Sequence, residues 1–233
     1  MKQYTDVFID FDDTLYDTHG NADIALREIF QLYELHKYYD DPDVFYNTYW
    51  KVNAEVWDLY AKGEMSKDEL IVERFRRPFS LGKGLVADDS FCRKVNQVFL
   101  LTCAHQPNVV AGAHELVDYL RGKGYRLHIC SNGFHEVQYK KLDRCGMKDK
   151  FDTIILSEDA GYNKPSRLFF DYAFAKSGAN ASTTIMIGDS LTTDMQGAIN
   201  AGIDTIYFRR EGQQHSDDVM YTVESLVDIC NIL

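Results

Sequence analysis

The sequence predicts an α/β protein, with a Rossmann-like doubly wound parallel sheet as its core and an all-helical insertion. From residue 104 onward, short apolar runs with strand character alternate with helical segments, which is typical of a parallel sheet covered by helices. Residues 16–103 place their apolar side chains at helical spacing and contain no clear strand. We therefore expect a core made of residues 1–15 and 104–233, interrupted by a helical domain at residues 16–103.

The core elements follow from apolar runs and from the glycines that end helices. Val7–Ile9 is the first expected strand, close behind a polar N-terminus. Gly146, Gly178 and Gly202 each follow a helical segment, as is common at helix C-termini. Further strands are expected at residues 126–130, 153–156, 184–187 and 205–208, and helices at residues 113–121, 134–145, 166–176, 193–201 and 223–232.

The insertion carries helix start signals in addition to helical periodicity. Asp41 and Pro42 provide an N-cap and a proline at the first helical position. Ser66 and Glu69 form a capping box before another apolar stripe. We expect most of the aromatic residues to pack inside this domain, among them Tyr38, Tyr39, Tyr46, Tyr49, Trp50, Trp57 and Tyr60. A basic patch is expected to be solvated; it consists of Arg74, Arg76 and Arg77.

Composition excludes several classes of partner. The formal net charge of −11 argues against binding a nucleic acid polymer, which needs clustered Lys and Arg. The chain of 233 residues is long enough to bury a sizeable core, and it has no apolar run of about 18 residues, so we expect no membrane-spanning helix. Five cysteines without a CxxC pair, and an N-terminus without a signal-peptide pattern, predict a cytoplasmic protein.

Asp10-Phe-Asp12-Asp13-Thr14 follows the first strand directly. Two carboxylates one residue apart repel each other unless a cation or a proton intervenes. This arrangement suits phosphoryl transfer, with Asp10 as an ionised nucleophile, Asp12 as a protonated acid and a divalent metal beside the phosphate. An Asp-rich turn that merely closes a strand is an equally good interpretation of the pentapeptide alone.

Polar residues also follow three later strands. Ser131 ends the strand of residues 126–130, Lys164 follows the strand of residues 153–156, and Gly188-Asp189 follows that of residues 184–187 with Asp194 five residues on. Because ligands bind at the carboxyl ends of parallel strands, these side chains are expected to share one site with Asp10 and Asp12.

In these four motifs the chain resembles the haloacid dehalogenase-like hydrolase superfamily. The resemblance spans the chain apart from the detail of residues 16–103, which corresponds to that superfamily's cap domain. It is strongest to phosphatases of nucleoside 5′-monophosphates, because the second motif reads Ser131-Asn132-Gly133-Phe134, with Gln138, Leu142 and Gly146 at similar spacing. Asp13 stands where many relatives carry Gly, and Asp tolerates the unusual backbone angles of such a turn.

The resemblance implies an Mg²⁺-dependent phosphatase with an aspartyl-phosphate intermediate. Asp10, Asp12 and Lys164 would be catalytic, with Mg²⁺ held by Asp10, by the Asp12 carbonyl oxygen and by Asp189. Phosphate would be bound by Ser131, Asn132, Lys164 and Thr14, with Asp194 and Gly188 in support. Asp194 is expected to orient Lys164 or the metal-site loop.

The expected substrate is a small phosphate monoester, a pyrimidine nucleoside 5′-monophosphate in particular. Alternatives are a phosphatase of sugar phosphates or other small metabolites, a phosphomutase, and a 2-haloacid dehalogenase, which would need neither Asp12 nor a metal. A phosphonate hydrolase would need a cap lysine, for which Lys51 and Lys62 are present without a recognisable motif. A non-catalytic binding protein is disfavoured because all four motifs are intact. Gly82–Ala87 matches a dinucleotide-binding pattern but follows no strand, so a loop is expected there.

Overall fold

The computed structural model describes residues 3–233, which form two compact units. The first, here called the core unit, comprises the described residues up to Thr18 together with Pro107–Leu233. The second, here called the inserted unit, is the continuous segment His19–Gln106.

The core unit is built on a parallel sheet whose order, within residues 3–233, is β3-β2-β1-β4-β5-β6. The strands are β1 (Asp6–Ile9), β2 (Arg126–Ser131), β3 (Thr153–Leu156), β4 (Thr184–Gly188), β5 (Asp204–Phe208) and β6 (Tyr221–Val223). Strands β2 and β3 lie on one side of β1, and β4, β5 and β6 lie on the other. The direction in which the chain adds strands therefore reverses between β1 and β4. In a sheet of this kind ligands bind beyond the carboxyl ends of the strands at that reversal.

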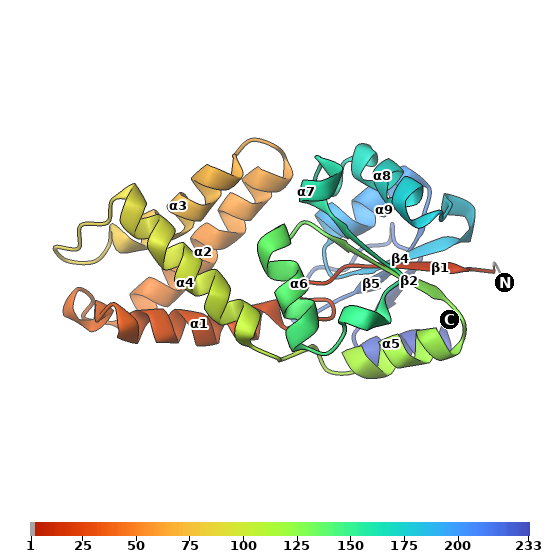
Figure 1. The fold of residues 1–233 in the computed structure, drawn as a ribbon, viewed down its shortest axis with the longest axis horizontal. Coiled ribbons are helices and arrows are strands. Elements are labelled where there is room, and N and C mark those ends of the chain that lie inside the picture. Colours follow the sequence, from red (N-terminus) through yellow and green to blue (C-terminus); the bar gives the residue numbers. More distant parts are fainter. Residues whose placement is uncertain (1–2) are drawn as a thin grey trace. The chain divides into compact units, whose positions relative to one another are not determined.

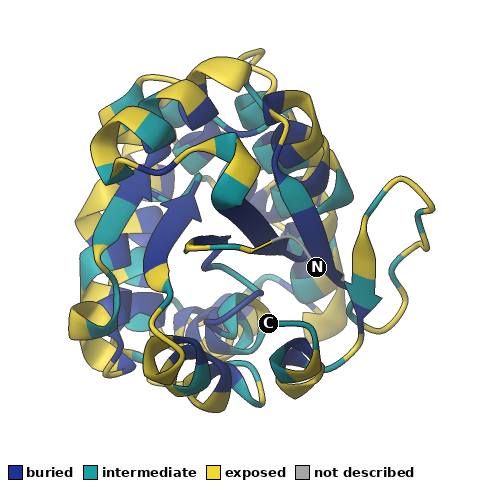
Figure 2. Ribbon diagram, turned by 90° about the vertical axis from the view of Figure 1, so that its right-hand side faces the viewer, coloured by how far each residue is buried: buried dark blue, intermediate teal, exposed yellow. Residues whose placement is uncertain are grey.

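Helices cover both faces of the sheet (Figure 1). Along β1, Val7 and Ile9 join the apolar cluster under α5 and η5, whereas Phe8 joins the cluster under α8 and α9, as the alternation of side chains in a strand requires. Figure 2 shows the central strands buried inside a shell of helices with exposed outer surfaces. The helical elements of this unit are α5 (Ala113–Gly122), α6 (His135–Arg144), η2 (Lys148–Lys150), α7 (Ser157–Ala160), α8 (Arg167–Ser177), η3 (Ala181–Thr183), η4 (Leu191–Met195), α9 (Gln196–Ala201) and η5 (Leu226–Asn231).

The predicted doubly wound α/β fold is confirmed, and two helices need correction. The helix predicted at residues 193–201 is α9 preceded by a π-helical turn, η4. The helix predicted at residues 223–232 is wrong, because Tyr221–Val223 pairs with β5 and only Leu226–Asn231 is helical, as a 3₁₀ segment. A three-residue edge strand is too short to show an alternating pattern, so pairing with β5 decides its conformation.

The inserted unit consists of helices and their connecting loops, with no strand among its described residues. Its elements are α1 (Thr18–Leu32, whose first residue belongs to the core unit), η1 (Leu35–Lys37), α2 (Pro42–Ala61), α3 (Lys67–Phe79) and α4 (Asp89–His105). Asp41 caps α2 with Pro42 at its first turn, and Ser66 and Glu69 form the predicted capping box of α3. Tyr39 and Tyr49 are buried in its aromatic core, against which Tyr38, Tyr46 and Trp50 pack. Gly82–Ala87 is a loop between α3 and α4, as predicted.

The expectation of a solvated basic patch holds for Arg76 and Arg77 but is wrong for Arg74. That side chain is buried, with its Nη2 donating to the Tyr49 hydroxyl at 2.8 Å and its guanidinium 4.5 Å from the Phe99 ring centroid. Position 74 lies on the apolar stripe of α3 together with Leu70, so helical periodicity turns it inward. Among the described residues, no helix is both long enough and apolar enough to cross a bilayer.

Candidate active site

The candidate site lies at the carboxyl ends of the central strands. Asp10 follows β1 directly, and its backbone N–H donates to the carbonyl of Ile187 in β4 at 2.9 Å. Asp189 follows β4, and Ser131 is the last residue of β2. The parallel register aligns these strand ends, since Ile9 pairs with both Ile129 and Ile187. The polar residues that follow the strands therefore meet at one edge of the sheet.

Lys164 is the cation at the centre of this edge. Its side chain is buried, and its Nζ donates to Asp10 Oδ1 at 2.7 Å, to Asp194 Oδ1 at 2.7 Å and to the Cys130 carbonyl at 2.6 Å. Burial alone would lower the pKa of Lys164, but the two carboxylates outweigh it and raise the pKa above its ordinary value. The lysine is therefore a permanent positive charge between Asp10 and Asp194.

Two neighbours hold the groups around Lys164 in place. The Asn132 side chain accepts from the Lys164 backbone N–H at 2.8 Å and donates to the Lys164 carbonyl at 3.0 Å. These two bonds link the β2 loop to Lys164 through the Asn132 side chain, and the predicted part of Asn132 in phosphate binding stays a prediction. At Gly188, a Cβ would lie 2.4 Å from Asp194 Oδ2, so only glycine leaves room for the Asp194 carboxylate.

Three buried carboxylates converge here. Oxygens of Asp10, Asp189 and Asp194 lie within 4.8 Å of one another. Burial raises the pKa of Asp10 well above its usual range, with Lys164 opposing and the other carboxylates adding to the rise. Burial and Asp194 raise the pKa of Asp189 to about 7, although Arg210 opposes this. Such a cluster of oxygen ligands with an excess of negative charge fits a hard divalent cation such as Mg²⁺.

Asp12 is held apart from these three carboxylates. Its Oδ1 accepts from Lys141 Nζ at 2.6 Å and from Thr18 Oγ1 at 2.7 Å. Its Oδ2 accepts from Gln138 Nε2 at 2.5 Å and from Ser131 Oγ at 3.3 Å. Burial opposes ionisation, but Lys141 and the hydrogen bonds outweigh it and lower the pKa of Asp12. This ligand-free arrangement therefore favours the ionised form of Asp12, and its predicted role as a protonated acid stays a prediction for the phosphate-bound site.

The turn that carries Asp12 has the expected backbone. Asp13 adopts a positive φ of 63°, a conformation that Asp accepts more readily than most residues. Thr14 is buried, and its hydroxyl donates to Asp189 Oδ1 at 3.4 Å. The Ser131 hydroxyl accepts from the Gly133 backbone N–H at 2.9 Å, so it lies beside the loop that follows β2.

Comparison with known proteins places the chain in a family. Residues 7–202 match the model of the haloacid dehalogenase-like hydrolases. The chain belongs to the haloacid dehalogenase-like hydrolase family. It is 30% identical to the HAD-hydrolase YfnB of Bacillus subtilis over 236 residues, covering 100% of this chain and 97% of YfnB. The crystal structure of magnesium-bound YfnB superposes with a TM-score of 0.89 at 28% identity and covers 100% of this chain and 99% of that one.

Two further relatives of this hydrolase have named activities. The pyrimidine 5′-nucleotidase PynA of Streptococcus pneumoniae is 32% identical, with 99% of this chain and 95% of PynA covered. The pyrimidine 5′-nucleotidase YjjG of Escherichia coli is 29% identical, with 97% and 96% covered. These similarities extend over both units and confirm the resemblance that the sequence motifs predicted.

Arg210 is a second cation of the hydrolase that the sequence analysis did not identify. It follows β5, and its Nη2 and Nε lie 2.7 Å and 3.0 Å from Asp189 Oδ2. Gln213 fixes the loop by accepting from the Arg210 backbone N–H and donating to the Asp189 carbonyl. Because Arg210 belongs to none of the four motifs, only the folded loop reveals its proximity to Asp189.

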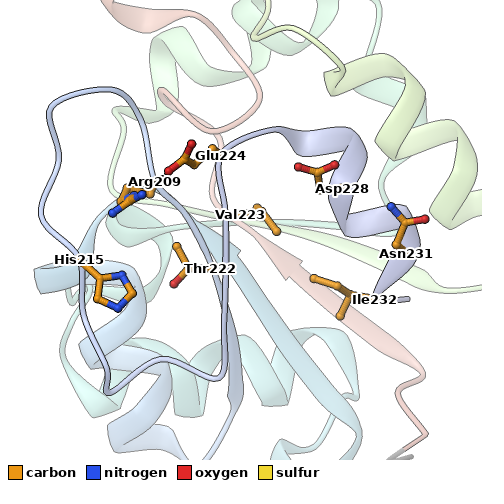
Figure 3. Close-up of a pocket in the computed structure, with 8 residues that line it drawn as sticks. All are labelled: Arg209, His215, Thr222, Val223, Glu224, Asp228, Asn231 and Ile232. Carbon is orange, nitrogen blue, oxygen red and sulfur yellow. Dashed lines mark hydrogen bonds and ion pairs between the residues drawn. The ribbon is translucent and has the colours of Figure 1, made fainter.

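A separate hollow of about 620 Å³ lies beside β6 (Figure 3). Arg209, His215, Thr222 and Glu224 are among its lining residues, and Arg209 forms an ion pair with Glu224. None of the carboxylates of the Asp10 cluster belongs to this lining. His128, also outside the site, is buried in β2, and its Nε2 lies 3.0 Å from Asp6 Oδ1.

Proposed function

We propose that this hydrolase is an Mg²⁺-dependent phosphatase that cleaves nucleoside 5′-monophosphates, pyrimidine nucleotides in particular, through an aspartyl-phosphate intermediate. The observation that carries the proposal is the convergence of Asp10, Asp189 and Asp194, two of which, Asp10 and Asp194, contact the Lys164 ammonium. A carboxylate nucleophile, a fixed cation and a cluster of oxygen ligands are what phosphoryl transfer to a protein side chain requires.

In the first step, the Asp10 carboxylate forms a bond to phosphorus while the ester P–O bond breaks. Lys164 stabilises the negative charge that spreads over Asp10 and the transferring group, because it already lies 2.7 Å from Asp10 Oδ1. Asp12 gives its proton to the leaving alkoxide. A bound phosphate dianion adds negative charge beside Asp12 and favours the protonated form that this step uses.

In the second step, water attacks the phosphorus of the aspartyl phosphate. Asp12 takes a proton from that water, the bond between Asp10 and phosphorus breaks, and inorganic phosphate leaves. Acid–base help of this type is worth on the order of 10²- to 10⁴-fold in rate. The hydroxyls of Ser131 and Thr14, with backbone N–H groups of the β2 loop, are proposed to bind the phosphoryl oxygens.

Asp10 and Asp189, together with the Asp12 carbonyl oxygen, are the proposed Mg²⁺ ligands, and the contact of Asp194 with Lys164 suits a supporting role. When bound, Mg²⁺ supplies positive charge that offsets the repulsion between the carboxylates and the phosphate. Burial first, and the Asp194 carboxylate second, raise the pKa of Asp189 to about 7, so a cation beside it would favour its ionised form.

The nucleotide preference has the support of two relatives, since PynA and YjjG are both named pyrimidine 5′-nucleotidases. The test compares kcat/KM for UMP and dUMP with the values for AMP, hexose phosphates, glycolate phosphate and pyrophosphate, all with Mg²⁺. We expect the pyrimidine nucleotides to lead by at least tenfold, about 1.4 kcal/mol in transition-state binding. A tenfold preference for a non-nucleotide would refute the substrate and leave the phosphatase chemistry standing.

The Asp10→Asn variant is the control for the chemistry, because an amide is a poor nucleophile. It should form no phosphoenzyme and release no phosphate from any ester. Turnover of the Asp10→Asn variant at the wild-type rate would refute the proposed mechanism.

A further inference from the structure

The Asp12 carboxylate is bound by two side chains of α6, a helix that supplies none of the proposed catalytic residues. Gln138 and Lys141 lie one turn apart on α6, on the same face of the helix. They contact different oxygens of Asp12, with Lys141 Nζ 2.6 Å from Oδ1 and Gln138 Nε2 2.5 Å from Oδ2. Both residues are buried, because Lys141 is 7% exposed and Gln138 is 0% exposed. Two buried donors thus fix both oxygens of one carboxylate.

Gly133 provides the space for this arrangement. A Cβ at position 133 would lie 2.0 Å from Gln138 Nε2 and 2.9 Å from Asp12 Oδ2. The first distance is far below van der Waals contact, so any side chain here would displace the Gln138 amide. Gln138 Nε2 also lies 2.6 Å from the Ser131 hydroxyl, which ties the carboxylate to the end of β2. The loop is therefore shaped around the contact between Gln138 and Asp12.

The buried Lys141 ammonium needs the Asp12 carboxylate as its counter-charge. A buried ammonium is costly unless a carboxylate compensates it. The Lys141 Nζ also lies 5.2 Å from the centroid of the Tyr16 ring. An aromatic face stabilises a cation but supplies no full negative charge. The ion pair with Asp12 therefore holds the ammonium in place and restricts the carboxylate in turn.

We propose that Lys141 and Gln138 are positioning residues that hold the Asp12 carboxylate where it serves the leaving group in the first step and the water in the second. The inference rests on the proposed phosphatase function. Neither residue exchanges a proton in this proposal, and each acts by limiting the rotation of Asp12. Loss of either should therefore slow the steps that use Asp12 and leave attack by Asp10 intact.

Burst kinetics with p-nitrophenyl phosphate separate these steps, because nitrophenolate leaves without a proton. For Lys141→Met we expect a burst of one nitrophenolate per active site, with a burst rate within about threefold of the wild type. Steady turnover, which needs Asp12 as the base, should fall about 10- to 100-fold, part of the full acid–base contribution. With a nucleoside monophosphate, phosphoenzyme formation should slow as well, since its alkoxide needs the proton.

Three matched variants complete the experiment. Lys141→Arg keeps the cation and should regain at least tenfold in steady turnover over Lys141→Met. Lys140→Met removes an exposed lysine from the same helix and should behave as wild type. Gln138→Met preserves side-chain length but removes the donor to Oδ2, and it provides the same burst test if Lys141→Met does not fold.

Unchanged steady turnover in both Lys141→Met and Gln138→Met would overturn the inference. Equal losses in burst rate and steady turnover would also overturn it, because they would place the effect on Asp10 or on folding. A wild-type protein that releases no phosphate from any ester in Mg²⁺ would instead refute the proposed function itself.

Discussion

Replacing Lys164 by methionine should test how strongly one buried cation stabilises the core unit. Lys164 contacts Asp10 and Asp194 at 2.7 Å each, and all three side chains are buried. At an effective dielectric constant of about 20, each contact contributes roughly 6 kcal/mol of attraction, which offsets the cost of burying the charges. Methionine keeps the approximate length but leaves two buried carboxylates without this cation. Breaking a buried pair in this way costs about 3–5 kcal/mol.

The loss of stability in Lys164→Met should depend on pH. Without Lys164 the folded-state pKa of Asp10 should rise further above its unfolded value near 4, because the cation that opposes the rise is gone. The folded variant then binds more protons than its unfolded chain, so its stability increases as pH falls from 8 toward 5. The deficit relative to wild type should therefore be largest at pH 8 and should shrink at pH 5.

The assay is urea unfolding in EDTA at both pH values, followed by circular dichroism. Lys176→Met is the matched control, because Lys176 pairs with Asp159 at 3.3 Å on the surface and should contribute no more than about 1 kcal/mol. A Lys164→Met deficit no larger than that of the control would contradict the reasoning. So would a deficit of equal size at pH 5 and pH 8.

Three further predictions concern the carboxylate cluster. Chelation by EDTA should abolish phosphatase activity and Mg²⁺ should restore it; full turnover in chelator would contradict the metal assignment. The metal-free protein should lose stability as pH rises from about 4 to about 7, because the folded-state pKa of Asp189, about 7, exceeds its unfolded value. Urea titrations should find this slope, on the order of 4 kcal/mol in total, and saturating Mg²⁺ should flatten it. Arg210→Met should tighten Mg²⁺ binding about tenfold by calorimetry, since it removes a cation from Asp189; Arg209→Met is the control, and equal affinities would exclude this competition.

The strand ends were the part of the site most accessible from the sequence. An apolar run predicts a buried strand, and the carboxyl ends of parallel strands lie at the same edge of the sheet. Asp10, Ser131 and Asp189 could therefore be placed together without coordinates, and the contact between Lys164 and Asp194 followed the expected pairing. Their chemical roles stay predictions until the variants are measured.

The residues that the sequence analysis missed share a physical reason. Lys141 lies on a helix and Arg210 in a loop, and neither position carries a local pattern that distinguishes it from a solvated surface cation. The face of α6 that turns inward depends on Leu142, which joins the apolar cluster of the sheet, and the path of the loop after β5 depends on Gln213. The edge strand β6 was missed for a related reason, since its pairing with β5 rather than its own pattern defines it.

The position of β1 also decides the order in which the chain can assemble during synthesis. Asp6 pairs with Arg126 on one side and with Thr184 on the other, so β1 leaves the ribosome long before either partner exists. His19–Gln106, by contrast, is continuous and makes its contacts locally. Local contacts form faster than pairings between distant segments. We expect a ribosome-bound chain that stops at residue 125 to protect His19–Gln106 from protease while residues 6–18 are cut, and protection of both segments would contradict this order.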